Sequence, residues 1–399
     1  MQFVRVLSWV LKWGKVMSVL EKAIQDTLKQ KLAFCKFISA NDAGSTGAHQ
    51  SGIYIPLIAW PILFDEHGQK GENKEEFVTI RWQDDFETDS RFIYYGQKTR
   101  NEYRITRFGR GFPFLKDEYV GDLFVLVKIT SQFYHAYILD SDEDIENYLS
   151  SVGLTAIQTN RIIDTHSMKQ TIPTLEQLFE DYINGLNVEF PDTAQISLKA
   201  REFYHLLSGK LVVQPDNLLL KWLDMEYTLF RAIESNRYQT RISTLFSSID
   251  ELVVCANTLL NRRKSRAGKS LEHHLSEMFR INELNFGSQV TTEGNKKPDF
   301  IFPGETQYHD HTFSNGDLIF LASKTTCKDR WRQILNEADR IPIKHLFTLQ
   351  QGISENQLTE MYKHQVVLVV PKPYIASFPM EFRSRILTLE SFISMIKNK

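Results

Sequence analysis

The pattern of apolar residues changes near residue 170 and divides the chain into two halves that are built differently. Before that point, short runs of β-branched and aromatic residues alternate with clusters of Gly, Asn and Asp. These runs cover residues 52–56, 77–82, 123–129 and 132–139. Many short strands separated by turn residues favour a barrel or a sandwich. The first half is therefore predicted to be a β-rich domain.

The second half combines helices with strands. Helical patterns cover residues 193–207, 217–235 and 246–261. From residue 271 onward the two patterns alternate, with helices over 271–280, 328–341 and 355–362 and strands over 298–302, 318–323, 345–349 and 366–370. Such alternation predicts an α/β domain with a parallel or mixed sheet flanked by helices. Pro173 and Pro191 indicate a linker, which gives domains over 17–170 and 193–399 joined by residues 171–192.

Composition limits the kinds of partner that are open to this chain. A length of 399 residues suits two domains. The formal net charge is -2, so any binding of nucleic acid depends on local basic patches. Cys35, Cys255 and Cys327 form no C-x-x-C pair, which argues against a disulfide framework or a zinc site and favours the cytoplasm.

The N-terminal segment leaves two possibilities open. Residues 1–16 are too short and too charged to cross a bilayer, and no other segment suggests a membrane partner. Ser18 followed by Glu21 predicts a capping box at the start of a helix. Met17 could therefore be the natural start, or residues 1–16 could form an amphipathic helix packed on the body.

Asp299, Lys324 and Glu337 are the strongest candidates for catalysis. They are predicted in a strand, at the end of the next strand and on the following helix. Two carboxylates can hold Mg²⁺, which polarises a phosphodiester, while the lysine offsets the developing charge. Arg330 would share a helix face with Glu337 and could read guanine. A turn, a solvated lysine and a solvated helix face would give the same pattern, so spacing alone does not decide.

Two basic segments are candidate DNA contacts. Residues 262–269 hold five basic side chains that could follow phosphates or could form a solvated interhelical segment, and their place just before Glu272 favours DNA. In the first half, Arg100, Glu102 and Arg104 alternate and would share one face of a strand. That face suits base reading in the major groove, or it is an edge strand protected by charge. The acidic residues 140–146 are interpreted as a solvated loop and helix start.

Residues 261–272, 292–299 and 324–339 resemble the EcoRII family of type II restriction endonucleases. The resemblance implies a restriction-endonuclease fold with an active site of Glu272, Asp299, Tyr308, Lys324, Lys328 and Glu337. Asp299 and Glu337 would hold Mg²⁺, with Glu272 as an accessory acid. The residues implied in DNA contact near this site are Arg262, Lys264, Lys328, Asp329 and Arg330, the last three reading G·C pairs. Ala322 stands where the broader nuclease superfamily has an acid.

Residues 39–56 and 98–111 resemble the amino-terminal DNA-binding pseudobarrel of the same family. The effector-DNA contacts that this implies are His49, Tyr54, Lys98, Arg100, Glu102 and Arg104. Tyr103 stands where a basic residue is expected. The resemblance further implies a homodimer that cuts double-stranded DNA at a CCWGG-like site, with the first domain restraining the nuclease until a second site binds. A repair or mismatch endonuclease of the same fold and a non-catalytic DNA-binding protein remain alternatives.

Overall fold

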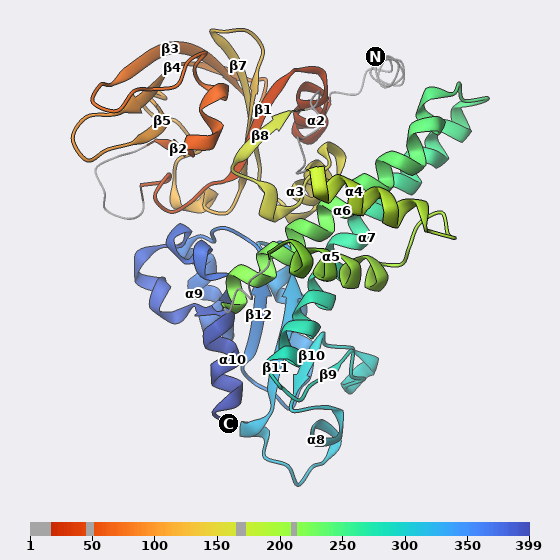
Figure 1. The fold of residues 1–399 in the computed structure, drawn as a ribbon. Coiled ribbons are helices and arrows are strands. Elements are labelled where there is room, and N and C mark those ends of the chain that lie inside the picture. The colour runs from red at the N-terminus through yellow and green to blue at the C-terminus, as the bar shows by residue number, and fades with distance from the viewer. Residues whose placement is uncertain (1–16, 45–51, 165–172, 209–213) are drawn as a thin grey trace.

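The first domain is a β-rich unit, as its sequence predicts. The computed structural model describes residues 17–44, 52–164, 173–208 and 214–399 (Figure 1). An eight-stranded sheet has the order β2-β5-β4-β3-β7-β6-β1-β8. Its elements are α2 (Val19–Lys29), β1 (Leu32–Phe37), β2 (Ile53–Ile55), β3 (Lys74–Trp82), β4 (Phe86–Tyr95), β5 (Glu102–Thr106), β6 (Leu123–Lys128), β7 (Phe133–Leu139), α3 (Asp142–Val152) and β8 (Arg161–Asp164).

Local signals place the ends of these elements. The capping box is confirmed, because Ser18 Oγ accepts from the Glu21 amide and the Glu21 carboxylate accepts from the Ser18 amide. Neighbouring strands pair antiparallel except β3 and β7, which run parallel. Alternate residues of these strands enclose an aromatic core that includes Trp82, Phe92 and Phe124. One face of the sheet therefore forms this core, and the opposite face of β1, β6 and β7 is buried in a second cluster with α2 and α3.

Four helices lie beside both domains: α4 (Pro173–Asn184), α5 (Thr193–Ser208), α6 (Pro215–Ser243) and α7 (Ile249–Ile281). Much of the predicted linker is helix α4, whose Phe179 and Ile183 are buried in a cluster with α5 and α6. The helices predicted at 246–261 and 271–280 are one helix, so the interhelical alternative for residues 262–269 is wrong. Its buried face continues through the polar stretch at Arg266, whose charge is neutralised inside the protein by Glu226.

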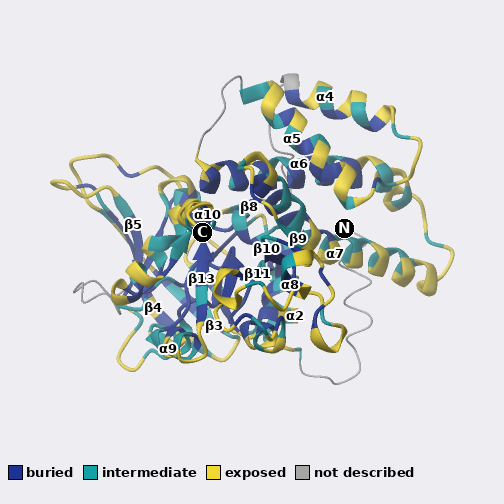
Figure 2. Ribbon diagram, turned by 90° about the horizontal axis from the view of Figure 1, so that it is seen from below, coloured by how far each residue is buried: buried dark blue, intermediate teal, exposed yellow. Residues whose placement is uncertain are grey.

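The second domain contains a mixed sheet, as predicted. Its six strands have the order β14-β13-β12-β11-β10-β9, in which β11 to β14 run parallel and β10 is antiparallel to β11 and β9. The elements are β9 (Gly287–Ser288), β10 (Phe300–Phe302), α8 (Glu305–His309), β11 (Ile319–Lys324), β12 (Lys344–Thr348), α9 (Glu355–Lys363), β13 (Val366–Val370), β14 (Leu387–Thr388) and α10 (Leu389–Lys397). Figure 2 shows β10, β11 and β13 largely buried inside the domain.

Alternate residues of this sheet point to two apolar layers. Phe300 and Leu321 pack on the side of α7 and α10, whereas Ile301 and Phe320 pack on the side of α9. The first layer continues into α3 of the first domain through Leu149. The two domains therefore share buried apolar surface. No helix in the described part of the chain is long and apolar enough to cross a membrane.

The predicted helix over 328–341 is wrong in type and in length. Only Arg330–Asn336 is helical, as a 3₁₀ helix (η6), and Glu337 follows it in an extended conformation. Trp331 and Ile334 are buried, and a spacing of three residues places side chains on one side of a 3₁₀ helix as well. Pro342 disfavours helix at the residue before it. Asp299 also lies just before β10 and not within it.

Candidate active site

Asp299 is held at the start of β10 by its neighbours across the sheet. The pairing of Phe300 with Leu321 places Asp299 opposite Ala322. One carboxylate oxygen accepts from the amide of Ser323 at 2.7 Å and from its hydroxyl at 3.1 Å. The other accepts from the Gln289 side chain at 3.1 Å. This buried carboxylate therefore has a fixed orientation at the end of β11, where Lys324 is the last strand residue.

Glu272 and Glu337 approach the same place from other elements. Glu272 lies on α7, which packs against β11. Burial and then the charge of Asp299 raise the pKa of Glu272 to about 7, while Lys324 opposes the shift. Burial and the charge of Asp299 also raise the pKa of Glu337, again opposed by Lys324. The fold thus brings together four of the side chains that the sequence nominated.

Two lysines that the sequence did not nominate hold the backbone around Glu337. Buried Lys344 of β12 donates to the carbonyl of Glu337 and, at 2.7 Å, to the carbonyl of Ala338, which has a φ of 50°. Lys296 donates to the carbonyl of Asn336. Burial lowers the pKa of Lys344 to about 8. Sequence reasoning missed Lys344 because a lysine at the start of a strand is ordinarily solvated.

A divalent cation suits the electrostatics of this site. The carboxylates of Glu272 and Glu337 hydrogen-bond to none of the described residues, and the negative charge of Asp299 raises the pKa of both. A cation would relieve that repulsion, and the Asp299 oxygen that accepts only from Gln289 keeps a lone pair for it. Among the described residues no group of three or more His, Cys, Asp or Glu side chains is close enough to hold a metal. The site therefore fits an ion that binds two protein carboxylates and keeps several waters, as Mg²⁺ does.

The nominated base-reading segment is in contact with the first domain. Lys328 forms a buried ion pair with Asp122, which precedes β6. Burial raises the pKa of Asp122 to about 7, against the attraction of Lys328. The carboxylate of Asp142, at the start of α3, accepts from the backbone amides of Lys328, Asp329 and Arg330 at 3.1, 2.6 and 3.1 Å. Three consecutive amides of this segment are thus occupied by one acid of the other domain.

Arg330 itself is paired with the same helix. Both terminal nitrogens donate to the carboxylate of Glu146, at 2.5 and 2.8 Å. Glu146 also accepts from the Thr325 hydroxyl at 3.3 Å. The acidic residues 140–146 do begin a helix, but Asp142 and Glu146 are interface residues and not solvated ones. Their signal in the sequence was only an acidic run, which cannot reveal what it contacts.

Three other nominated residues of the described chain form no hydrogen bond or ion pair with the clustered acids. The Tyr308 hydroxyl donates to Glu293 at 2.5 Å. Arg262 donates to the Tyr238 hydroxyl at 2.6 Å and stacks 4.4 Å from the centre of the Phe190 ring. Lys264 is exposed on α7. Tyr308 and Arg262 therefore have structural partners already, and their catalytic or DNA-binding roles stay predictions.

The nominated surface of the first domain is formed by β2, β5 and the turn before β5. Tyr54 and Arg104 are paired residues of adjacent strands. Arg104 is buried and lies 3.4 Å from the Glu102 carboxylate. Lys98 and Arg100 are exposed in the turn, where Arg100 stacks on Tyr95. His49 lies outside the described residues, and Tyr103 is a core residue whose hydroxyl accepts from the Gly68 amide.

Comparison with known proteins gives matches in both domains. The family model for the EcoRII N-terminal domain matches residues 27–160, and the EcoRII C-terminal model matches residues 230–393. The type II restriction enzyme EcoRII of Escherichia coli is 38% identical over 382 residues, covering 90% of this chain and 93% of that protein. The type II restriction enzyme SsoII of Shigella sonnei is 27% identical over 145 residues, covering 33% and 45%.

Two solved structures also match. A complex of the restriction endonuclease PspGI with substrate DNA has a TM-score of 0.44 and 13% identity, covering 58% of this chain and 98% of that one. Metal-depleted Ecl18kI in complex with uncleaved, modified DNA has a TM-score of 0.43 and 19% identity, covering 56% and 83%.

Proposed function

The chain belongs to the EcoRII family of type II restriction enzymes, and on that premise we propose that it hydrolyses both strands of DNA at a CCWGG-like site with Mg²⁺. The observation that carries the proposal is the convergence of Asp299, Lys324 and Glu337 at one end of β10 and β11. A repair or mismatch endonuclease would share this site, but it would nick one strand or cut without this sequence preference. A non-catalytic DNA-binding protein would have no use for the cluster.

In this proposal Asp299 and Glu337 hold the metal, and Glu272 is an accessory acid. When bound, Mg²⁺ supplies charge that polarises the scissile phosphate and favours attack by water. Lys324 offsets negative charge that develops on the phosphate oxygens. Ser323 and Gln289 fix the Asp299 carboxylate, so it needs no reorganisation when DNA arrives. The raised pKa of Glu272, about 7, allows this carboxylate to take up a proton near neutral pH.

The interface contacts support the proposed restraint by the first domain. Base reading by Lys328, Asp329 and Arg330 requires donors and acceptors that point at base edges. At present Asp122 and Glu146 take the charges of Lys328 and Arg330, and Asp142 takes the backbone amides between them. We propose that binding of an effector site to the β2–β5 surface releases these contacts. Tyr308 and Lys328 would then lie beside bound DNA.

Cutting both strands needs two active sites, and we propose a homodimer in which each protomer cuts one strand of a near-palindrome. A cytoplasmic location belongs to the same proposal. The free cysteines Cys35 and Cys327 are buried and form no disulfide among the described residues, which agrees with a reducing compartment.

Cleavage of plasmids carrying one or several CCWGG sites tests the proposal, with Mg²⁺ and with EDTA, beside Asp299→Ala. We expect discrete Mg²⁺-dependent fragments from the multi-site plasmid, slow cutting of the single-site plasmid and no cutting by Asp299→Ala. Folded protein that shifts duplex DNA but cuts no plasmid would leave a DNA-binding module. Nicked circles alone would favour the repair endonuclease.

A further inference from the structure

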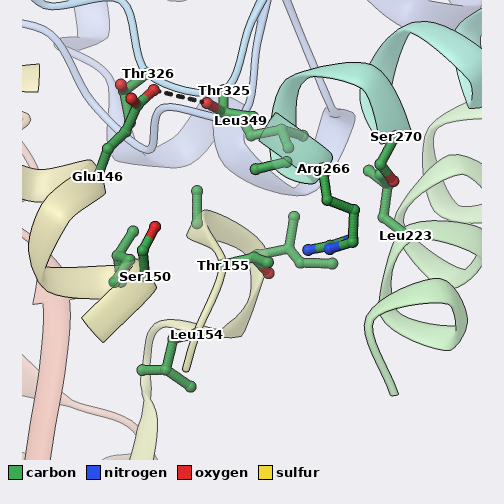
Figure 3. Close-up of a pocket in the computed structure, with 14 residues that line it drawn as sticks. Glu146, Ser150, Leu154, Thr155, Leu223, Arg266, Ser270, Thr325, Thr326 and Leu349 are labelled. Atoms are coloured by element: carbon green, nitrogen blue, oxygen red, sulfur yellow. Dashed lines mark hydrogen bonds between the residues drawn. The ribbon is translucent and has the colours of Figure 1, made fainter. Parts of the chain in front are cut away.

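A cavity lies between the two domains (Figure 3). Its empty volume is about 510 Å³, part of which is open to solvent. One wall is α3 and the loop after it, from the first domain. The opposite wall belongs to α6, α7 and the segment after β11. Thr326 in that segment is two residues after Lys324, and Ser270 of α7 is two residues before Glu272.

Three buried polar atoms of the nuclease wall have no hydrogen-bond partner among the described residues. They are Arg266 Nε, Ser270 Oγ and Thr326 Oγ1. Their residues are 4%, 1% and 1% exposed and all three line the cavity. A buried polar group without a partner destabilises the fold, and native structures contain few of them. Three in one cavity indicate that this wall is made for another occupant.

The side chain that now reaches this wall from the first domain is acidic. Glu146 lines the cavity and accepts from the neighbouring Thr325 hydroxyl, while its two oxygens also hold Arg330. Figure 3 shows Glu146 close to Thr325 and Thr326. The Glu146 carboxylate therefore accepts from one donor of this wall, the Thr325 hydroxyl, and leaves the three buried polar atoms without partners among the described residues. The group that satisfies the whole set should also be an anion with several acceptor oxygens.

We propose that this wall binds a backbone phosphate of the target DNA after α3 has moved away. The proposal rests on the proposed nuclease function, because it needs DNA beside Lys324. Thr326, Ser270 and the Nε of Arg266 donate to phosphate oxygens, as hydroxyls and guanidinium groups do in other protein–DNA contacts. Glu146 leaves with α3, while the carboxylate of Glu226 stays paired with a terminal nitrogen of Arg266 and leaves its Nε free to donate. These contacts position the scissile strand relative to the active site and read no base.

Thr326→Val and Ser270→Ala separate this role from a structural one. If the hydroxyls lack partners in the closed protein, replacing them with apolar groups should leave the melting temperature unchanged or raise it. Cleavage of multi-site DNA should fall, with kcat/KM lower by about tenfold for each lost phosphate contact. Thr27→Val is the matched control, because the buried Thr27 hydroxyl is partnered by the Tyr148 hydroxyl at 2.9 Å. It should lower the melting temperature and leave cleavage unchanged.

A tighter closed form could also slow cutting, so both variants are measured again in Asp142→Ala protein, in which the interface is weakened. The proposal expects the same loss of kcat/KM in both backgrounds. Recovery of full cleavage in Asp142→Ala protein would mean that the hydroxyls act only through closure, and would overturn it. So would a fall in melting temperature with normal cleavage. Unmodified protein that cuts nothing would instead refute the proposed function.

Discussion

The two surfaces nominated for DNA differ in the partners of their charged residues. On the first domain, Arg104 pairs with Glu102 of the same strand, and Lys98 is exposed. On the nuclease domain, Lys328 and Arg330 pair with acids of the other domain. The two surfaces therefore differ in how they respond if the domains separate. The first surface keeps its geometry, whereas the second surface has free donors only after separation. Under the proposed function, the first surface binds DNA before the second.

The largest expected effect breaks catalysis and leaves the first surface intact. Asp299→Asn and Glu337→Gln should each lower cleavage by at least about a thousandfold, because a metal ligand supports several kcal/mol of transition-state stabilisation. The affinity for a single-site duplex, measured by gel shift in Ca²⁺, should stay within about twofold of that of the unmodified protein. The substituted residues are distant from the first surface, and distant changes act independently.

Asp317→Asn is the matched control, since Asp317 is an exposed acid of the same domain. It should cut normally. Full activity of Glu337→Gln would show that the second ligand is another acid, and Glu272 would be the next to change.

Removing an acid from the interface should free the second surface. Asp142→Ala removes the acceptor of three backbone amides, so we expect cutting of single-site plasmid to rise by about tenfold, the size of a modest coupling between sites. Glu143→Ala changes an exposed neighbour and should have no effect. Equal rates for Asp142→Ala and unmodified protein, with one site and with several, would contradict restraint through this contact.

The backbone at Glu337 and Ala338, which follows the base-reading segment, is held by a residue of the same domain. Lys344→Met removes the donor to the Glu337 and Ala338 carbonyls, and the Mg²⁺ concentration for half-maximal cutting should rise by about tenfold, as for other groups that orient metal ligands. Lys344→Arg should recover part of the loss. The Mg²⁺-induced shift in melting temperature gives a second readout.

The exposed Lys363 of α9 provides the control variant Lys363→Met, which should match the unmodified protein in both readouts. A large loss of stability in Lys344→Met with unchanged Mg²⁺ dependence would assign Lys344 to the core alone.

Much of this architecture could be predicted because it follows from local pattern. The strands near residues 77–82 and 366–370 have the alternating or fully apolar residues that half-buried and buried strands need. Residue type and order singled out Asp299, Lys324 and Glu337, and the family resemblance favoured a nuclease site where spacing alone did not decide. The helix at 328–341 was wrong, because a spacing of three residues fits both helix types and only the tertiary contacts of Trp331 and Asp142 select one.

Other features could not be predicted because they depend on contacts between distant segments. Asp142 and Lys328 are separated by 186 residues, and neither sequence position indicates the other. Lys344 is buried because carbonyls of another loop surround it, which no property of its own strand shows. The polar stretch of α7 can bury Arg266 because Glu226, from a different helix, neutralises its charge. Composition reveals charges, but only the fold reveals their partners.

The smallest expected effect is a pH dependence of the contact that covers the second surface. Burial raises the pKa of Asp122 to about 7 from an ordinary 3.8, with Lys328 opposing the shift and the charges of Asp140 and Asp329 adding to it. An exposed Asp122 in the open form would titrate near the ordinary value. Between these values the closed form holds a proton that the open form has lost, so closure weakens as pH rises through this window.

The ratio of single-site to multi-site cutting rates should therefore rise a few-fold between about pH 5.5 and pH 7.5, less than the tenfold that a full pKa unit of linkage would give. Taking the ratio removes the pH dependence of catalysis itself, to which Glu272 contributes through its own pKa of about 7. Asp122→Asn should give a ratio that does not change with pH. A ratio that falls with rising pH in the unmodified protein would mean that attraction between ionised Asp122 and Lys328 outweighs the burial of the charge, and would contradict this linkage.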